Sequence, residues 1–268
     1  MEPSELQQRI SAFPRWHYRF EFAGGIATRP PDPGMANRHE QRRRYIFDPL
    51  LALTGGSLRG RRVLDLGCNA GYWSLLAAEA QADFVLGIDA REVHIEQANL
   101  VFEAKGVDRS RYRFEQGNVF AHRIDERFDI ALCLGLLDHV AKPVELFELM
   151  TRAGAELIVL DTEISRSKES LFDVTSLYDS DSVVDHELVL IPSRQAIYDL
   201  AAEFGMAAVP LAPNMTDYTG MLDYERGRRL AFICSASIPL SGLAIERRPP
   251  LLPWWAGALL KRRRGGAR

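Results

Sequence analysis

A short apolar run leading into a glycine-containing turn, residues 63–71 (VLDLGCNAG), most narrowly limits the fold of this chain. Glycine lets the backbone approach a ligand where a side chain would collide, and it also permits positive φ. The residues that follow the turn, 72–80, have the composition of a helix. A strand, a glycine turn and a helix in this order are typical of an α/β domain that binds a nucleotide at the turn.

Short apolar runs alternate with helix-like segments over most of the chain. The sequence predicts strands at residues 62–66, 84–89, 112–115, 128–134, 156–161, 206–210 and 229–236. It predicts helices at residues 41–53, 72–80, 91–104, 143–150 and 194–204, the last with Ser193 as its N-cap and Gly205 just past its end. This alternation predicts a Rossmann-like, doubly wound α/β fold, with a mostly parallel, seven-stranded sheet covered on both faces.

The composition divides the chain into three stretches. Residues 1–60 are rich in aromatic residues and arginine, and the proline-rich residues 29–34 are expected to interrupt any helix. We expect this stretch to be a lid or substrate segment, with the arginines at 42–44 on a solvated helix face. Residues 61–240 carry the strand and helix alternation, and residues 241–268 form a basic tail that contains prolines and tryptophans.

The overall composition is that of an ordinary soluble protein, with 47% apolar and 26% charged residues. The chain has no apolar run of about 18 residues, and its first ten residues lack the apolar stretch of a signal peptide. Its three cysteines are widely spaced in apolar surroundings, which favours reduced thiols over a disulfide framework or a zinc site. We therefore expect a cytoplasmic protein.

Charge is unevenly distributed along the chain. Residues 61–240 carry 17 Lys and Arg against 29 Asp and Glu, whereas both ends are basic. An acidic body is poorly suited to follow a phosphate backbone, so nucleic acid is not the favoured partner. The tail from residue 247 onward has two interpretations, a disordered or surface-docked extension or a peripheral membrane contact through its tryptophans and basic cluster.

Two aspartates indicate which nucleotide the turn accepts. A dinucleotide site would need three glycines spaced to seat a pyrophosphate, but here Asp65 precedes Gly67 and only Gly71 follows. A carboxylate would repel a phosphate, whereas it suits the ammonium group of a methionine moiety. Asp89, at the end of the next strand, is the expected partner of two ribose hydroxyls. These features favour S-adenosylmethionine over a nicotinamide cofactor.

Four segments in this order resemble the successive motifs of class I S-adenosylmethionine-dependent methyltransferases: residues 63–71, 87–89, 117–118 and 128–131. Further segments resemble the tRNA wobble-uridine carboxymethyl/methyltransferase family and its small-molecule relatives, namely residues 16–18, 24–28, 134–139 and 192–205. The resemblance implies that residues 61–240 are the methyltransferase domain. It also implies that Asp89 binds ribose, that Asn118 contacts the adenine amine, and that the loop after Leu134 backs the methionine end.

The chain departs from the family pattern at three positions. Asn69 replaces the usual third glycine, Asn118 replaces the usual acid, and Asp138 precedes the histidine where relatives often have an aromatic residue. The residues that read a carboxylated cofactor in the carboxymethyl enzymes are not recognisable here. The resemblance therefore implies ordinary S-adenosylmethionine.

The candidate site residues fall into three groups, and no metal site is expected. The cofactor group is Asp65, Gly67, Cys68, Asn69, Gly71, Asp89, Ala90, Asn118, Val119 and Leu134. The catalytic candidates are His139, as a base that removes an acceptor proton, and Asp161. The substrate candidates are Trp16, His17, Tyr18, Tyr178 and Tyr218. Purely structural roles stay open: Asp65 could stabilise the turn, Asp89 could cap the next helix, and His139 could hold its loop.

The sequence thus predicts a methyltransferase that methylates an oxygen of a small molecule such as a sugar, glycolipid or secondary metabolite. A tRNA wobble uridine is the alternative acceptor. A non-catalytic cofactor-binding protein is a third hypothesis, which the retained Asp65, Gly67, Gly71 and Asp89 disfavour. The sequence indicates no particular oligomeric state.

Overall fold

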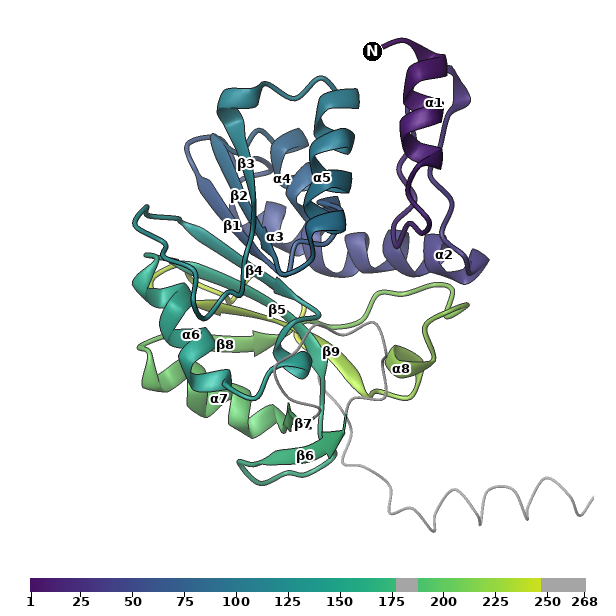
Figure 1. Cartoon of the computed structure of the whole chain (residues 1–268). Helices are drawn as coiled ribbons and strands as arrows, with labels where there is room; N and C mark the ends of the chain where they lie inside the picture. The colour runs from purple at the N-terminus through teal and green to yellow at the C-terminus, as the bar shows by residue number, and fades with distance from the viewer. Residues whose placement is uncertain (177–187, 247–268) are drawn as a thin grey trace, which may run out of the picture.

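The computed structural model describes residues 1–176 and 188–246 and is built around one seven-stranded sheet. The strand order is β3-β2-β1-β4-β5-β9-β8 (Figure 1). Neighbours among the first five are parallel, whereas β9 is antiparallel to both β5 and β8. The strands are β1 (Arg62–Leu66), β2 (Phe84–Asp89), β3 (Tyr112–Gln116), β4 (Ile130–Leu134), β5 (Leu157–Glu163), β8 (Ala207–Pro210) and β9 (Arg229–Ser235). The predicted fold class is confirmed.

The strand order places a crevice between β1 and β4. From β1 the chain runs outward through β2 and β3, and it then returns to add β4 and β5 on the other side of β1. In open α/β sheets such a reversal leaves a crevice at the carboxyl ends of the strands, and ligands bind there. The turn at residues 67–71 follows β1 directly and therefore lies at this position.

Helices cover both faces of the sheet (Figure 1). On one face lie α3 (Asp48–Leu53), α4 (Tyr72–Glu79) and α5 (Glu92–Ala104), whose buried residues share one apolar core with the N-terminal segment. On the other face, α6 (Pro143–Arg152) and α7 (Arg194–Glu203) contribute to a second core. In α6 the buried Leu146 and Phe147 precede the buried Met150 by four and three residues, so one stripe of the helix faces the sheet.

The N-terminal segment is more helical than the sequence predicts. It contains α1 (Pro3–Ser11), the short η1 (Ala23–Gly25) and α2 (Pro33–Arg42), which continues through the π-helical turn η2 (Arg43–Phe47) into α3. The proline-rich stretch was expected to interrupt helices, but it starts one. Asp32 Oδ1 accepts a hydrogen bond from Gly34 N at 2.7 Å, and Pro33 occupies the first helical position. Pro49 lies two residues past the π turn, at the start of α3, and lacks the N–H that an α-helical hydrogen bond back into that turn would need.

The remaining elements lie beyond β5. A two-stranded ribbon of β6 (Phe172–Ser176) and β7 (Leu188–Pro192) was not predicted, and α8 (Leu222–Glu225) precedes β9. Two short turns, η3 (Arg109–Arg111) and η4 (Leu137–His139), complete the fold. No helix in residues 1–176 and 188–246 is long and apolar enough to span a membrane. Tyr178 and the two interpretations of the tail, which concern residues 247–268, fall outside the described residues.

Candidate functional site

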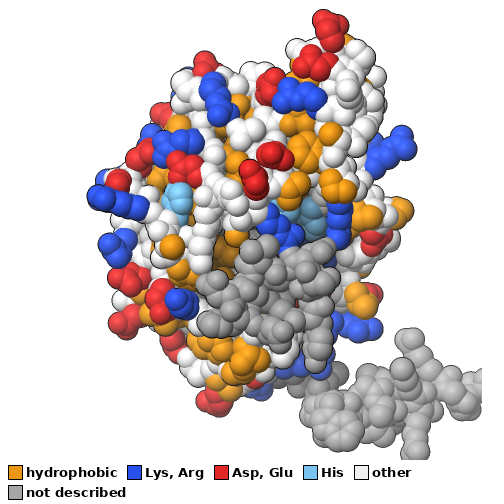
Figure 2. All heavy atoms as spheres, viewed as in Figure 1, with side chains coloured by type: hydrophobic (Ala, Val, Ile, Leu, Met, Phe, Trp, Pro, Cys, Tyr) orange, Lys and Arg blue, Asp and Glu red, His pale blue; other side chains and the backbone are white. Residues whose placement is uncertain are grey.

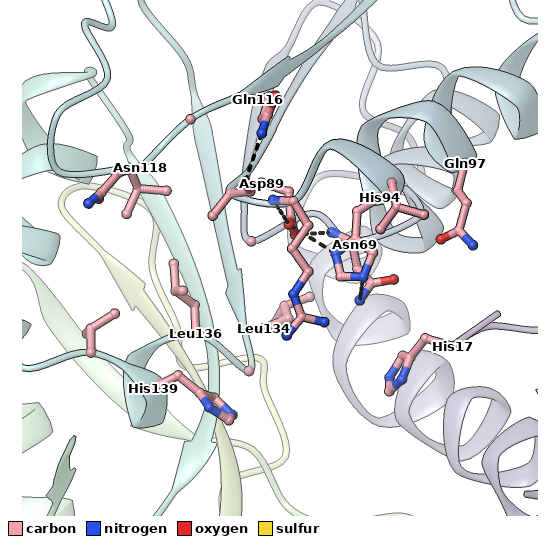
Figure 3. Close-up of a pocket in the computed structure, with 18 of the residues that line it drawn as sticks. His17, Asn69, Asp89, His94, Gln97, Gln116, Asn118, Leu134, Leu136 and His139 are labelled. Carbon is pink, nitrogen blue, oxygen red and sulfur yellow. Dashed lines mark hydrogen bonds and ion pairs between the residues drawn. The ribbon is translucent and has the colours of Figure 1, made fainter. Parts of the chain in front are cut away.

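A pocket of about 980 Å³ opens at the carboxyl end of the sheet. The first turn, the ends of β2, β3 and β4, the turn η4 and the N-terminal segment all contribute to its wall. Ten of the predicted site residues line it: His17, Tyr18, Gly67, Asn69, Asp89, Ala90, Asn118, Val119, Leu134 and His139. Figure 3 shows that His17 and His139 approach this space from different sides, with Asp89 and Asn69 between them.

The first turn is shaped by its backbone conformation. Gly67 and Asn69 adopt positive φ values of 70° and 49°, and asparagine is among the few residues that tolerate this region. The Asn69 Oδ1 atom accepts a hydrogen bond from Ala70 N at 2.7 Å, which holds the side chain against its own turn. Gly71 also has positive φ, and a Cβ there would lie 3.1 Å from Ala98 Cβ. Gly71 therefore shapes the turn without lining the pocket.

The Asp89 carboxylate is fixed by donors from three directions. Its Oδ2 accepts a hydrogen bond from Asn69 N at 2.8 Å, and its Oδ1 accepts from Arg91 N at 3.0 Å and from His94 Nδ1 at 3.0 Å. Burial raises the pKa of this carboxyl, but the hydrogen bonds and the nearby His94 outweigh that effect, so its pKa lies below the ordinary value. Asp89 is thus an ionised acceptor at the pocket wall.

Asp65 lies behind the turn and not in the pocket lining. Its side chain is buried, and Oδ2 accepts a hydrogen bond from Ser74 Oγ at 2.6 Å. Burial raises the pKa of this carboxyl to about 7, although the Ser74 hydrogen bonds partly oppose the shift. The nearby Cys68 is also buried and outside the lining. Both residues support the turn from within the core.

Beyond Asp89, the pocket wall continues at the end of β3. Asn118 and Val119 line this part, together with Leu134 at the end of β4. The Asn118 Oδ1 atom accepts a hydrogen bond from Phe120 N at 3.0 Å, which forms a local turn.

The N-terminal segment forms one wall of the pocket. His17 and Tyr18 line it, whereas Trp16 is buried and donates from Nε1 to Ile10 O at 3.1 Å. The Tyr18 ring stacks on Tyr72 with the ring centroids 4.7 Å apart. Burial, together with the nearby Arg42, lowers the pKa of His17 to about 4, so this imidazole is neutral at pH 7.

The two catalytic candidates lie in different environments. His139 lines the pocket with 33% of its side chain exposed, and its Nε2 lies 3.9 Å from Asp138 Oδ2. Asp161 is fully buried outside the lining, where it accepts hydrogen bonds from Arg42 Nη2 at 2.5 Å and from the Tyr224 hydroxyl at 2.7 Å. A carboxylate with these two donors is part of a structural network.

Buried arginines extend this network beneath the pocket. Arg229 donates to Asp138 and to the main-chain oxygen of Asp161, and both Arg42 and Arg229 line the pocket. The expectation that Arg42 lies on a solvated face is therefore wrong, because its side chain is buried and forms an ion pair with the buried Asp161. Its neighbours Arg43 and Arg44 instead form ion pairs with Glu40 at the surface.

Tyr218 lies outside the pocket lining and is 37% exposed. Several pocket residues that were not predicted from the sequence are basic or polar and come from segments far apart in the chain: Arg15, Arg38, Arg42, His94, Gln97 and Arg229. Among the described residues, no group of three or more His, Cys, Asp or Glu side chains could hold a metal ion. On the face drawn in Figure 2, the described residues show charged side chains of both signs, scattered and intermixed.

Comparison with known proteins identifies the type of domain. Residues 57–203 match the family model described as a methyltransferase domain. The chain is 36% identical over 125 residues to a tRNA U34 carboxymethyltransferase of Geobacter sp. strain M21, covering 43% of this chain and 36% of that protein. It is 41% identical over 103 residues to a ubiquinone biosynthesis O-methyltransferase of Bordetella avium strain 197N, covering 38% of this chain and 40% of that protein. The chain thus matches less than half the length of these relatives.

A solved structure shares most of the architecture. The N-terminal domain of EvdMO1, crystallised in the presence of SAH and D-fucose, superposes with a TM-score of 0.69 at 21% identity. The match covers 88% of this chain and 98% of that domain. The likeness concerns the fold. The resemblance inferred from the sequence motifs is confirmed by these comparisons.

Proposed function

Because this chain belongs to the methyltransferase-domain family, we propose that it transfers a methyl group from S-adenosylmethionine to an oxygen atom of a small molecule. The observation that carries the proposal is the placement of Asp89 and His139 in the wall of one pocket. An ionised acceptor that suits ribose hydroxyls and an imidazole that suits proton removal thereby face a common space.

The residues present fit the cofactor. The turn at Gly67 leaves room for close approach of a ligand to the backbone, and Asp89 offers its Oδ2 atom to a hydroxyl of a ribose diol. Asn118 and Val119 would hold the adenine, and Leu134 would back the methionine end. When bound, S-adenosylmethionine supplies a methyl group on a positively charged sulfur. Asp65 and Cys68 would act indirectly, by supporting the turn from the core.

In this proposal the protein aligns the acceptor oxygen and removes the proton from its hydroxyl group. Positioning the acceptor oxygen in line with the transferred methyl group lowers the barrier by removing translational and rotational freedom. His139 would accept the hydroxyl proton at an imidazole nitrogen as the new carbon–oxygen bond forms. Asp161 is assigned no chemical step here, since Arg42 and Tyr224 occupy its carboxylate.

We further propose that residues 1–60 form the substrate-facing wall of residues 61–240. Pro14, Arg15, His17 and Tyr18 line the pocket from a segment that precedes the sheet. The segment is anchored by its own apolar residues, which share the core formed with α4 and α5. Acceptor selectivity would therefore depend on residues outside the region matched by the family model.

The acidic segment of residues 61–240 supports a small-molecule acceptor, and the O-methyltransferase among the relatives supports oxygen as the acceptor atom. A tRNA wobble uridine is the second candidate, because another relative is a tRNA carboxymethyltransferase. The two acceptors are separated by incubating the protein with methyl-labelled S-adenosylmethionine and either a metabolite extract or bulk tRNA. We expect label in the metabolite fraction, whereas label confined to tRNA would contradict the small-molecule proposal.

A further inference from the structure

A closed ring of hydrogen bonds joins three residues at the cofactor side of the pocket, Asn69, Asp89 and His94 (Figure 3). Asn69 N donates to Asp89 Oδ2 at 2.8 Å, and His94 Nδ1 lies 3.0 Å from Asp89 Oδ1. The side-chain nitrogen of Asn69, Nδ2, lies 3.5 Å from His94 Nε2 and closes the ring. The three residues come from the first turn, the end of β2 and the start of α5, so the ring ties these elements together.

The contacts around His94 determine which of its ring nitrogens carries the proton. The Asn69 Oδ1 atom already accepts from Ala70 N at 2.7 Å, so its NH₂ end faces the imidazole. The His94 Nε2 atom must then accept a hydrogen bond, and the ring proton resides on Nδ1, where it is donated to Asp89. A neutral imidazole with its proton on Nδ1 satisfies every contact in the ring.

The ring leaves the carboxylate well oriented and still able to bind a ligand. Both side chains are largely buried, with 15% of His94 and 12% of Asp89 exposed, and both residues line the pocket. The protein donors, which include Arg91 N at 3.0 Å, hold the carboxylate in place. Oδ1 accepts from Arg91 N and His94 Nδ1, whereas Oδ2 accepts from Asn69 N alone, so Oδ2 keeps one lone pair for a ligand hydroxyl.

We propose that His94 is a positioning residue that fixes Asp89 for a ligand carrying a vicinal ribose diol. The inference rests on the proposed function, because it concerns the same cofactor site. Without the imidazole donor, the Asp89 carboxylate would lose a side-chain partner and gain rotational freedom. Ligand binding would then have to immobilise this side chain, and that cost would lower the affinity. His94 thereby acts on the ribose through Asp89.

The test measures binding of S-adenosylhomocysteine to the full chain by calorimetry. His94→Phe keeps an aromatic ring without a donor, whereas His94→Asn places an amide N–H close to the position of Nδ1. We expect His94→Phe to weaken binding about tenfold, as for loss of a hydrogen bond to a charged group. We expect His94→Asn to recover most of that loss. Thermal unfolding of each variant checks that the fold is retained.

A second ligand isolates the ribose. For an S-adenosylhomocysteine analogue lacking both ribose hydroxyls, wild type and His94→Phe should bind equally, because the group that Asp89 recognises is absent. Equal affinity of wild type and His94→Phe for S-adenosylhomocysteine itself would overturn the inference while leaving the proposed cofactor intact. A tenfold loss that persists with the analogue would also overturn it. Failure of the wild-type chain to bind S-adenosylhomocysteine would instead contradict the proposed function.

Discussion

Arg42 Nη2 lies 2.5 Å from Asp161 Oδ2, and this buried ion pair joins the end of α2 to β5 across 119 positions of sequence. The Arg42 side chain is 6% exposed and that of Asp161 is completely buried. The Tyr224 hydroxyl donates to both oxygens of the same carboxylate. The pair therefore anchors the N-terminal wall of the pocket to the central sheet.

Asp161→Asn should destabilise the protein by about 3 kcal/mol, because it leaves the buried Arg42 cation without a counter-charge. Denaturant unfolding measures the change. Glu40→Gln is the matched control, since it removes the surface ion pairs of Arg43 and Arg44 and should cost less than about 1 kcal/mol. An Asp161→Asn variant with wild-type stability and abolished methyl transfer would show instead that Asp161 is catalytic.

Replacing His139 should slow chemistry without weakening cofactor binding. His139→Gln is expected to lower the turnover number about a hundredfold, which is the lower end for loss of a general base, while the Kd of S-adenosylmethionine stays unchanged. The assay uses the labelled acceptor fraction together with calorimetry. His122→Gln is the control, because His122 pairs with Glu115 outside the pocket lining and should leave both values unchanged. Unaltered turnover in His139→Gln would make its role structural.

Asp65 should make stability depend on pH in an unusual direction. Its pKa in the folded chain is about 7, above its ordinary value of 3.8, so folding favours the protonated form. The stability that this group contributes is present below about pH 4 and is lost as the pH rises toward 7. Relative to Asp65→Asn, the wild type should therefore lose unfolding free energy between pH 5 and about 7, as measured by denaturation at each pH. A constant difference between the two proteins would contradict the buried environment of Asp65.

His39 should destabilise the N-terminal segment in acid. Burial, with a further contribution from Arg42, lowers its pKa from 6.5 to about 2, so the unfolded chain takes up this proton first as the pH falls. Wild type should lose about 2 kcal/mol relative to His39→Gln between pH 6.5 and 4.5. Chemical denaturation at these two pH values tests the difference. Equal losses in the two proteins would show that His39 is readily protonated in the folded state.

The sequence predicted the central sheet because inner strands such as β1 and β4 are almost completely buried and are rich in apolar residues. It did not predict β6, whose residues are largely exposed, or β7, although residues 188–191 form a short apolar run. The start of α2 was missed because Pro33 was interpreted as a helix breaker, although proline is favourable at the first helical position.

For the site, the residues that follow strands in sequence could be identified, since strand ends converge in this fold. Asp89, Asn118 and His139 are of this kind, and all three line the pocket. Arg42 and Arg229 could not be identified, because their positions depend on contacts with Asp161 and Asp138 made far along the chain. His94 could not be identified either, because it lies within the helix α5 and nothing in the helical pattern distinguishes it from other partly buried residues.

The central claim is that Asp89 binds the ribose of S-adenosylmethionine, and calorimetry of two aspartate variants tests it most directly. Asp89→Ala removes a carboxylate that accepts a main-chain N–H two residues ahead, from Arg91. Asp108→Ala removes one that makes the same local bond with Ser110, but outside the pocket lining. The account predicts binding to wild type and Asp108→Ala with the same Kd, and at least about tenfold weaker binding to Asp89→Ala. Equal affinity in all three proteins, or no binding to the wild type, would contradict it.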